Sequence, residues 1–170
     1  MTNIRQFFNY YHPGRNNILP GESMKLSTKT RYGVRMMQSL SEKYGRGPIY
    51  LKDIAREQGI SEKYLSLIVI PLRAAGLITS TRGAHGGYVL SREPSLITLK
   101  DIVDVLEGET CLVQCIKDVS TCPRVSVCPT RDVWTVIGER ISETLSGITL
   151  EQLVRMSREK EDNLVMMNDI

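Results

Sequence analysis

The sequence lacks any run of about 18 apolar residues, the length at which a membrane span is considered. We therefore expect no membrane partner. The only histidines are His12 and His85, each beside a glycine or proline, and no Ser-His-Asp or phosphate-loop pattern occurs, so we expect no enzyme. We interpret residues 1–23 as a loose leader without the apolar segment of a secretory signal, which predicts a cytoplasmic protein.

Cysteine is absent outside one stretch, CLVQCIKDVSTCPRVSVC, which spans residues 111–128 and holds all 4 cysteines. The hydrophobic content of 41% is enough for a core that needs no disulfide bonds. In the cytoplasm, clustered cysteines are more often metal ligands or redox-active groups than structural disulfides. The stretch is therefore the first candidate for a chemical site.

The net charge of +3 combines two regions of opposite sign. Residues 24–100 carry 13 Lys and Arg against 5 Asp and Glu, whereas residues 101–170 carry 7 against 13. A basic front half favours nucleic acid as a partner, with chance surface composition as the alternative.

Three helical patterns open the ordered part of the chain. The first covers residues 27–45, and two shorter ones meet at Gly59, where Ser61 can cap the second. Pro71 lies inside this last pattern, and we expect a kink or a break there. Two helices joined by a short glycine turn predict a helix-turn-helix, with an αα-hairpin of a helical bundle as the alternative.

The phrase GLITSTRGAHGGYVLS follows directly and holds two strand-like runs around a glycine-rich loop. A hairpin after a helix-turn-helix makes a winged helix, so the expected fold class is mainly α with a small β-hairpin wing. The wing tip carries Arg82 and His85, and such tips contact DNA phosphates or enter the minor groove. The alternative for Arg82 is that it only solvates the turn.

A short helix follows the wing, with Thr98 and Asp101 as a capping-box pair and Gly108 as its end. The longest amphipathic pattern covers residues 130–147, and we expect it to join two protomers, with a core helix of one protomer as the alternative. Its apolar stripe comprises Trp134, Ile137, Ile141 and Leu145. The expected divisions are a leader at 1–23, a DNA-binding domain at 24–108, a cysteine-rich loop at 109–130, a dimerisation helix with a short following helix at 131–156 and a charged tail at 157–170.

The cysteine spacings are C-x3-C, C-x6-C and C-x5-C. Structural zinc usually uses tight pairs separated by a longer stretch, so this even spread favours an iron–sulfur cluster wrapped by one loop. Prolines after Cys122 and Cys128 stiffen the loop. Zinc, direct thiol redox chemistry and unreactive cysteines are the alternatives.

Residues 24–156 resemble a family of bacterial winged-helix regulators that includes the iron–sulfur cluster regulator IscR, the nitric-oxide sensor NsrR and the cysteine regulator CymR. The likeness rests on MKLSTKTRYGVRMM, IAREQGISEKYLSLIVIPLRAAGLITSTRGAHGGYVL, ITLKDIVDVLEG, the cysteine loop and ITLEQLV, and RGAHGGY is highly specific. The family implies a homodimer crossed through the long helix that binds palindromic promoter DNA.

The resemblance also implies a function. Family members with cysteines commonly hold a 2Fe–2S or 4Fe–4S cluster that alters DNA binding, and the 2Fe–2S form is expected here. The chain is thus expected to sense cluster status, redox state or nitric oxide and to control genes of iron–sulfur cluster biogenesis. The alternatives are a regulator switched by zinc or by cysteine oxidation and a small iron–sulfur electron carrier.

By the same resemblance, Cys122 and Cys128 match the second and third ligand cysteines. Cys115 is the candidate for the first, with a spacing that differs by one residue from either common family pattern. Where relatives place a His or an Asp as the fourth ligand, this chain has Arg131 and Arg31, and arginine cannot bind iron. The candidates for the fourth position are Cys111 and, as runners-up, Glu107 and Glu109.

The residues expected to face the DNA groove share the N-terminal end of the recognition helix: Ser61, Lys63, Tyr64 and Ser66. The expected phosphate partners are three cations: Lys29, Arg31 and Arg73. For Tyr64 the alternative is packing against the first helix. Where several IscR-like relatives have Glu-Gln, this chain has Ser66-Leu67, so the preferred DNA sequence does not carry over.

Overall fold

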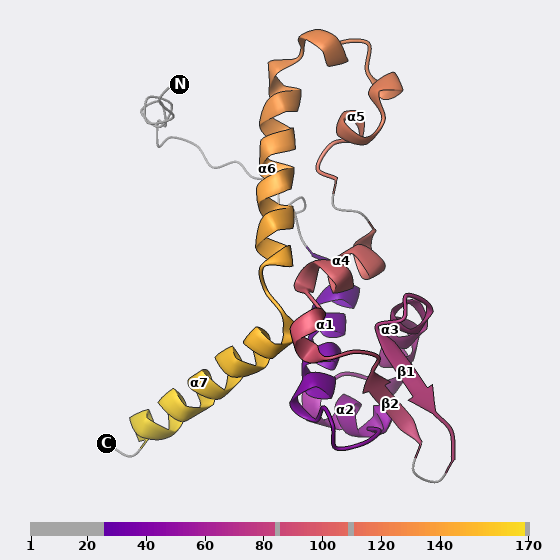
Figure 1. The fold of residues 1–170 in the computed structure, drawn as a ribbon, viewed down its shortest axis with the longest axis vertical. Helices are drawn as coiled ribbons and strands as arrows, with labels where there is room; N and C mark the ends of the chain where they lie inside the picture. The colour runs from indigo at the N-terminus through magenta and orange to yellow at the C-terminus, as the bar shows by residue number, and fades with distance from the viewer. Residues whose placement is uncertain (1–25, 84–85, 109–110, 169–170) are drawn as a thin grey trace.

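The computed structural model describes residues 26–83, 86–108 and 111–168, so the leader expected at 1–23 lies outside the described residues. The fold is mainly helical with one two-stranded antiparallel hairpin, as the sequence predicts (Figure 1). Its elements are α1 (Thr28–Glu42), α2 (Leu51–Gln58), α3 (Glu62–Ala74), β1 (Ile78–Thr81), β2 (Gly87–Leu90), η2 (Pro94–Leu96), α4 (Leu99–Glu107), α5 (Gln114–Lys117), η3 (Val119–Thr121), η4 (Val125–Val127), α6 (Pro129–Ser146) and α7 (Leu150–Asn168).

The helix-turn-helix forms where its local signals place it. The Ser61 hydroxyl accepts a hydrogen bond from the Tyr64 backbone N–H at 3.1 Å and so caps α3. Gly59 ends α2 with φ at 62°, in the left-handed region that glycine adopts without strain. The break considered at Pro71 is absent, because α3 continues through it to Ala74. Leu72, in the next position, is fully buried in the core.

The wing is an antiparallel hairpin in which Ile78 pairs with Leu90 and Thr81 with Gly87. A bridge between Ile49 and Tyr88 ties β2 to the segment before α2. Gly87 has φ at 150°, and a Cβ there would collide with the Ile49 backbone. The second glycine of the Gly-Gly step therefore lets β2 pass close to another segment of backbone.

One hydrophobic core is formed by α1, α2, α3, α4, the hairpin and the start of α7. Its fully buried members include Met36 and Met37 of α1, Ile68 of α3, Ile102 of α4 and Leu150 of α7. The Thr98–Asp101 capping box forms as predicted at the start of α4. This packed body positions α3 and the hairpin on one side, seen on the right of Figure 1.

Two helices leave the packed body. In Figure 1, α6 rises above it and α7 extends away below α6. No residue of α6 is buried, although the structure describes all of this helix. The helix after it is longer than the short one expected, because α7 runs on through the charged segment to Asn168. In the parts of the chain that the structure describes, no helix is long and apolar enough to cross a membrane.

Candidate functional site

The outward face of α3 is the first candidate site. Its inward face is the core stripe of Leu65, Ile68, Val69 and Leu72. This burial fixes the rotation of the helix, so Lys63 and Ser66 are exposed on the other side. The Ser66 hydroxyl donates to the Lys63 carbonyl oxygen at 2.7 Å, and Ser61 is engaged as the cap. Among the four predicted groove residues, Lys63 is the one with a charge, and its side chain is exposed.

Tyr64 is half-buried rather than fully presented to solvent. Its ring meets Tyr32 of α1 edge to face, with the ring centroids 5.6 Å apart. The guanidinium of Arg35 lies over the Tyr32 ring at 5.7 Å and donates to Gln58, which orients this cation beside the helix-turn-helix. Tyr64 thus packs against the first helix, as the alternative from the sequence has it, and its contact with DNA stays a prediction. Arg35 was not among the predicted residues, although its spacing of one helical turn from Arg31 could have indicated it.

The other predicted cations occupy different surroundings. Arg82 at the wing and Arg73 at the end of α3 are exposed, as phosphate partners must be. Arg31 is exposed and donates to the Thr28 hydroxyl at 3.1 Å. Lys29 is half-buried, and its charge acts on the Glu107 carboxyl of α4. His85 lies outside the described residues.

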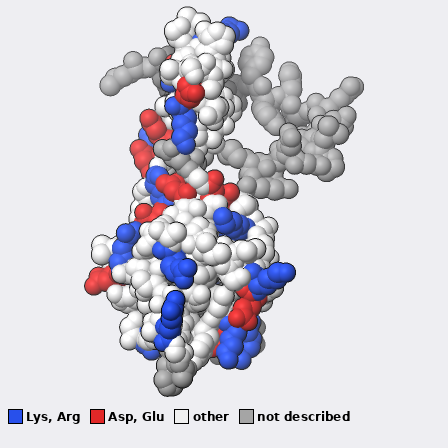
Figure 2. Space-filling model, turned by 90° about the vertical axis from the view of Figure 1, so that its right-hand side faces the viewer, with Lys and Arg blue, Asp and Glu red and all other residues white. Residues whose placement is uncertain are grey.

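Figure 2 shows the face that α3 and the hairpin form. Lys and Arg side chains are spread over the compact lower body, with uncharged surface between them. Most of the visible Asp and Glu lie higher up, where the body meets the ascending part of the chain, and a few stand beside the Lys and Arg at the edges of the lower body. The side formed by α3 and the hairpin therefore carries much of the positive charge of the basic front half of the sequence.

The cysteine loop is the second candidate site. It connects α4 to α6 through three short turns, α5, η3 and η4, and its thiols are all free and half-buried. The Cys111 thiol donates to the Val113 carbonyl oxygen at 3.1 Å. The Arg131 Nε donates to the Cys115 carbonyl oxygen at 3.2 Å, which links the loop to the first turn of α6. Arg131, at the position expected from the resemblance for a fourth ligand, thus contacts the backbone of the loop.

Cys128 stands at the N-cap of α6. Its Sγ lies 3.1 Å from the Thr130 hydroxyl oxygen. That hydroxyl, the backbone N–H of Arg131 and the charge of Arg124 together lower the pKa of the Cys128 thiol. A thiolate is the form that binds metals and reacts with oxidants. The lowered pKa of Cys128 increases the fraction of thiolate and so favours both reactions.

The donor set fits an iron–sulfur cluster by its chemistry, because four free thiols on one loop are the soft ligands that iron in such clusters requires. In the structure, however, the four thiols are not gathered around one point. Among the described residues, no three His, Cys, Asp or Glu side chains stand close enough together to hold a metal ion. Glu107 accepts the Ser27 backbone N–H at 2.6 Å and so holds the start of α1, while Glu109 lies outside the described residues. The ligand set named from the sequence stays a prediction.

The exposed side of α6 is the third candidate site. Trp134 is 42% exposed and Ile137 is 37% exposed, and Val133 and Val136 are more exposed still. A groove of about 370 Å³ runs along the same side of the helix. It is lined by Val136, Ile137, Arg140, Ile141, Thr144 and Leu145. An apolar stripe of this length has the form of a helix-packing surface.

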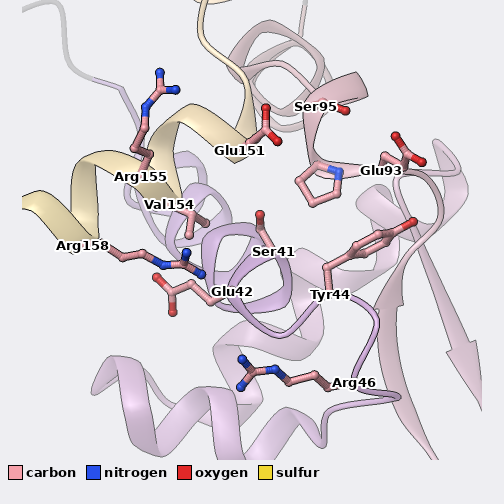
Figure 3. A pocket seen from close by; sticks show the side chains of 11 residues that line it. Ser41, Glu42, Tyr44, Arg46, Glu93, Ser95, Glu151, Val154, Arg155 and Arg158 are labelled. Carbon is pink, nitrogen blue, oxygen red and sulfur yellow. The ribbon is translucent and has the colours of Figure 1, made fainter.

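A separate open pocket of about 660 Å³ lies between the end of α1, η2 and α7 (Figure 3). In Figure 3, Glu42 lies next to Arg158, while Tyr44 and Glu93 stand across the opening. Its lining carries both charge signs and includes no residue of α3, the hairpin or the cysteine loop. It is thus distinct from the three candidate sites.

Comparison with known proteins identifies relatives of residues 26–156. The Rrf2 family, described as an iron-dependent transcriptional regulator, matches residues 26–156. The HTH-type transcriptional regulator CymR of Bacillus subtilis is 45% identical over 130 residues, which cover 76% of this chain and 89% of that protein.

Solved structures agree with this match. The structure of CymR, the global cysteine regulator of B. subtilis, has a TM-score of 0.67 at 43% identity and covers 79% of this chain and 98% of that one. The structure of T. potens IscR also has a TM-score of 0.67, at 40% identity, and covers 81% of this chain and 91% of that one. Relatives with two different names thus match almost equally well.

Proposed function

Because this chain belongs to the Rrf2 family of transcription regulators, we propose that it binds promoter DNA as a homodimer and senses iron–sulfur or thiol chemistry through its cysteine loop. Family membership makes it a DNA-binding regulator and not an enzyme. We place it in the cytoplasm, where its DNA is, and expect palindromic promoter sites because a symmetric dimer reads two half-sites.

One observation carries the sensory part of the proposal: every thiol lies in the segment that joins α4 of the packed body to α6. A change in this segment acts on both neighbours. The Arg131 contact with the Cys115 carbonyl and the place of Cys128 at the N-cap couple the loop to the start of α6. If α6 pairs two protomers, the loop controls how the two copies of α3 are placed relative to each other.

The residues that would hold a cluster are Cys115, Cys122 and Cys128, with Cys111 as the fourth ligand. An iron–sulfur cluster, expected as 2Fe–2S, would supply a link between these thiols that depends on iron supply and redox state. The chain itself contributes hydrogen bonds from the Thr130 hydroxyl and the Arg131 backbone, which lower the pKa of the Cys128 thiol.

A second candidate mechanism uses the thiols directly, either by oxidation or with zinc. It is supported by the state of the four cysteines, none of which is in a disulfide, so each is available to an oxidant or to zinc. The lowered pKa of the Cys128 thiol would also speed its reaction with an oxidant.

The test compares the wild type with the Cys122→Ser/Cys128→Ser double variant after anaerobic purification. We expect the wild type to contain equal iron and acid-labile sulfide and the double variant to contain neither. Ser126→Ala is the matched control, because Ser126 is exposed in the same loop and bears no thiol. Folded wild-type protein that never takes up iron would contradict the cluster, and a reversible loss of free thiols on mild oxidation would then support the direct mechanism.

DNA binding is tested separately by titrating promoter fragments at several salt concentrations. A regulator whose cations neutralise phosphates loses affinity steeply as salt rises. Absence of binding at low salt, in both the anaerobic and the air-exposed protein, would overturn this part of the proposal.

A further inference from the structure

The outward face of α3 has an apolar centre that the predicted DNA contacts do not include. Leu67 is 56% exposed and Ile70 is 59% exposed, although the inward face of the same helix is closed by four buried residues. The rotation of α3 is fixed by that burial, so neither side chain can turn into the core. Two large apolar side chains are thus held in solvent on the helix expected to enter the major groove.

The position of Leu67 along α3 matches that of a base-reading residue. It is one turn after Lys63 and follows Ser66, so it continues the N-terminal, groove-facing end of the helix. Exposed cations stand at both ends of the stripe, Lys63 before Leu67 and Arg73 after Ile70. This order places positive charge where phosphates flank the groove and apolar surface where base edges lie.

Leu67 has no donor or acceptor, so it cannot read a base by hydrogen bonds. Among the four bases, only thymine presents an apolar group in the major groove, its C5 methyl. Leucine against any other base edge would cover polar atoms without pairing them, which is unfavourable. The chemistry of this side chain therefore selects one base.

We propose that Leu67 is a specificity-determining residue that packs against the C5 methyl of a thymine in each half-site, with Ile70 covering the adjacent apolar surface. This inference rests on the proposed DNA-binding function and adds the base that α3 prefers. It also gives a reason why Ser66-Leu67 would prefer a different DNA sequence from the Glu-Gln pair of IscR-like relatives.

The probe is a duplex selected in vitro from a random library by the full-length wild-type protein. Each thymine in it is then replaced in turn by deoxyuridine, which removes one methyl group and leaves the hydrogen-bonding edge unchanged. Loss of one buried methyl contact should weaken binding about fourfold for one half-site, and about 15-fold when both half-sites are changed. We expect this loss at one symmetry-related thymine pair.

Leu67→Ala identifies the side chain responsible. The variant should bind the thymine duplex about as weakly as the wild type binds the deoxyuridine duplex, and it should not distinguish the two. Leu96→Ala is the matched control, since Leu96 is 61% exposed in η2, which packs against α7. This control should keep both the affinity and the thymine preference. Circular dichroism should show all three proteins folded, because both leucines are exposed.

The results separate the inference from its premise. If the wild type selects a duplex but no thymine replacement weakens binding, or if Leu67→Ala keeps the full thymine preference, Leu67 does not read the methyl group and the inference is overturned. Equal loss on both duplexes in Leu67→Ala also overturns it, because Leu67 then contacts something else, such as a second protein. If the wild type selects no duplex at all, the proposed DNA-binding function fails and the inference fails with it.

Discussion

Helices α3 and α6 are both amphipathic, but only α3 buries its apolar stripe within the protomer. In α3, Leu65 and Ile68 are fully buried, whereas α6 has no buried residue. The same sequence pattern therefore has two outcomes. It predicts that a helix face will be covered, but not whether the cover is the same chain or another one.

The free energies make the contrast sharper. Burial of one large apolar side chain contributes about 1.5–3 kcal/mol, and an isolated helix shorter than about 12–15 residues is marginal in water. With 18 residues, α6 is only somewhat longer than this limit, and it gains little from its own protomer. A second copy that covers Ile137 and Trp134 would supply the missing burial.

The largest effect is expected from Ile137→Glu, which would disrupt the proposed contact between two copies of α6. A charge in the middle of the α6 stripe should separate the proposed homodimer into folded monomers. A monomer binds one half-site without the second contact, so DNA affinity should fall by roughly 10²–10⁴-fold. Sedimentation measures the mass, and fluorescence anisotropy measures the affinity.

Ser146→Glu is the control for this variant, since it adds the same charge to an exposed position of α6 outside the stripe. It should leave the mass and the affinity unchanged. A dimer that survives Ile137→Glu would show that another surface joins the protomers.

On the α3 side, Ile68→Ala should destabilise the packed body by about 2–5 kcal/mol, because it leaves a cavity at a fully buried position. Ile70→Ala changes the same residue type two positions along the same helix, where the side chain is 59% exposed, and should shift stability by less than about 0.5 kcal/mol. Urea unfolding followed by circular dichroism measures both. Similar losses in the two variants would contradict the assignment of inward and outward faces.

The sequence predicted best what depends on near neighbours. The caps at Ser61 and Thr98 are found as expected, because a cap bonds within the next three residues. The hairpin was predicted because two strand-like runs flank a glycine-rich loop within a short span. At Pro71, of the kink or break expected, the break does not occur, because α3 continues through this residue to Ala74.

Other features could not be predicted because they have no period or depend on distant contacts. The helical turns of the cysteine loop are three or four residues long, too short for an apolar stripe. The contact between Tyr64 and Tyr32 joins two helices and leaves Tyr64 half-buried. The exposed pair Leu67 and Ile70 was visible in the sequence, but its meaning required the rotation of α3 that the core sets.

The next prediction concerns the wing, which is proposed to contact DNA. Gly87→Ala should cost about 1–3 kcal/mol and weaken DNA binding, because its φ of 150° and the Ile49 backbone leave no room for a Cβ. Gly83 also has a positive φ, 111°, but open space surrounds it, so Gly83→Ala should cost less. Thermal unfolding of both variants checks this order. An equal loss would show that backbone conformation alone, and not the approach to Ile49, requires glycine at 87.

The smallest effect is expected where the packed body meets the cysteine loop. Glu107, the last residue of α4, accepts the Ser27 backbone N–H, which starts α1. Although partial burial raises the pKa of its carboxyl, hydrogen bonds from Ser27 and Thr30 and the charge of Lys29 outweigh this and leave the pKa below the ordinary 4.5. Because the folded-state pKa is lowered, the carboxylate stabilises the fold above about pH 4.5, and this contribution is lost as the pH falls through the folded-state value.

Glu107→Gln should therefore be less stable than the wild type at neutral pH, by less than about 1 kcal/mol because the group is exposed and screened. The difference should shrink on acidification, since the wild-type carboxylate then becomes protonated while the amide does not titrate. Thermal unfolding of both proteins from neutral pH to below the carboxyl pKa follows the two curves. A gap that stays constant across this range would mean that Glu107 stabilises the α1–α4 contact by packing alone, and that the charge of Lys29 plays no part at the junction between the DNA-binding body and the loop.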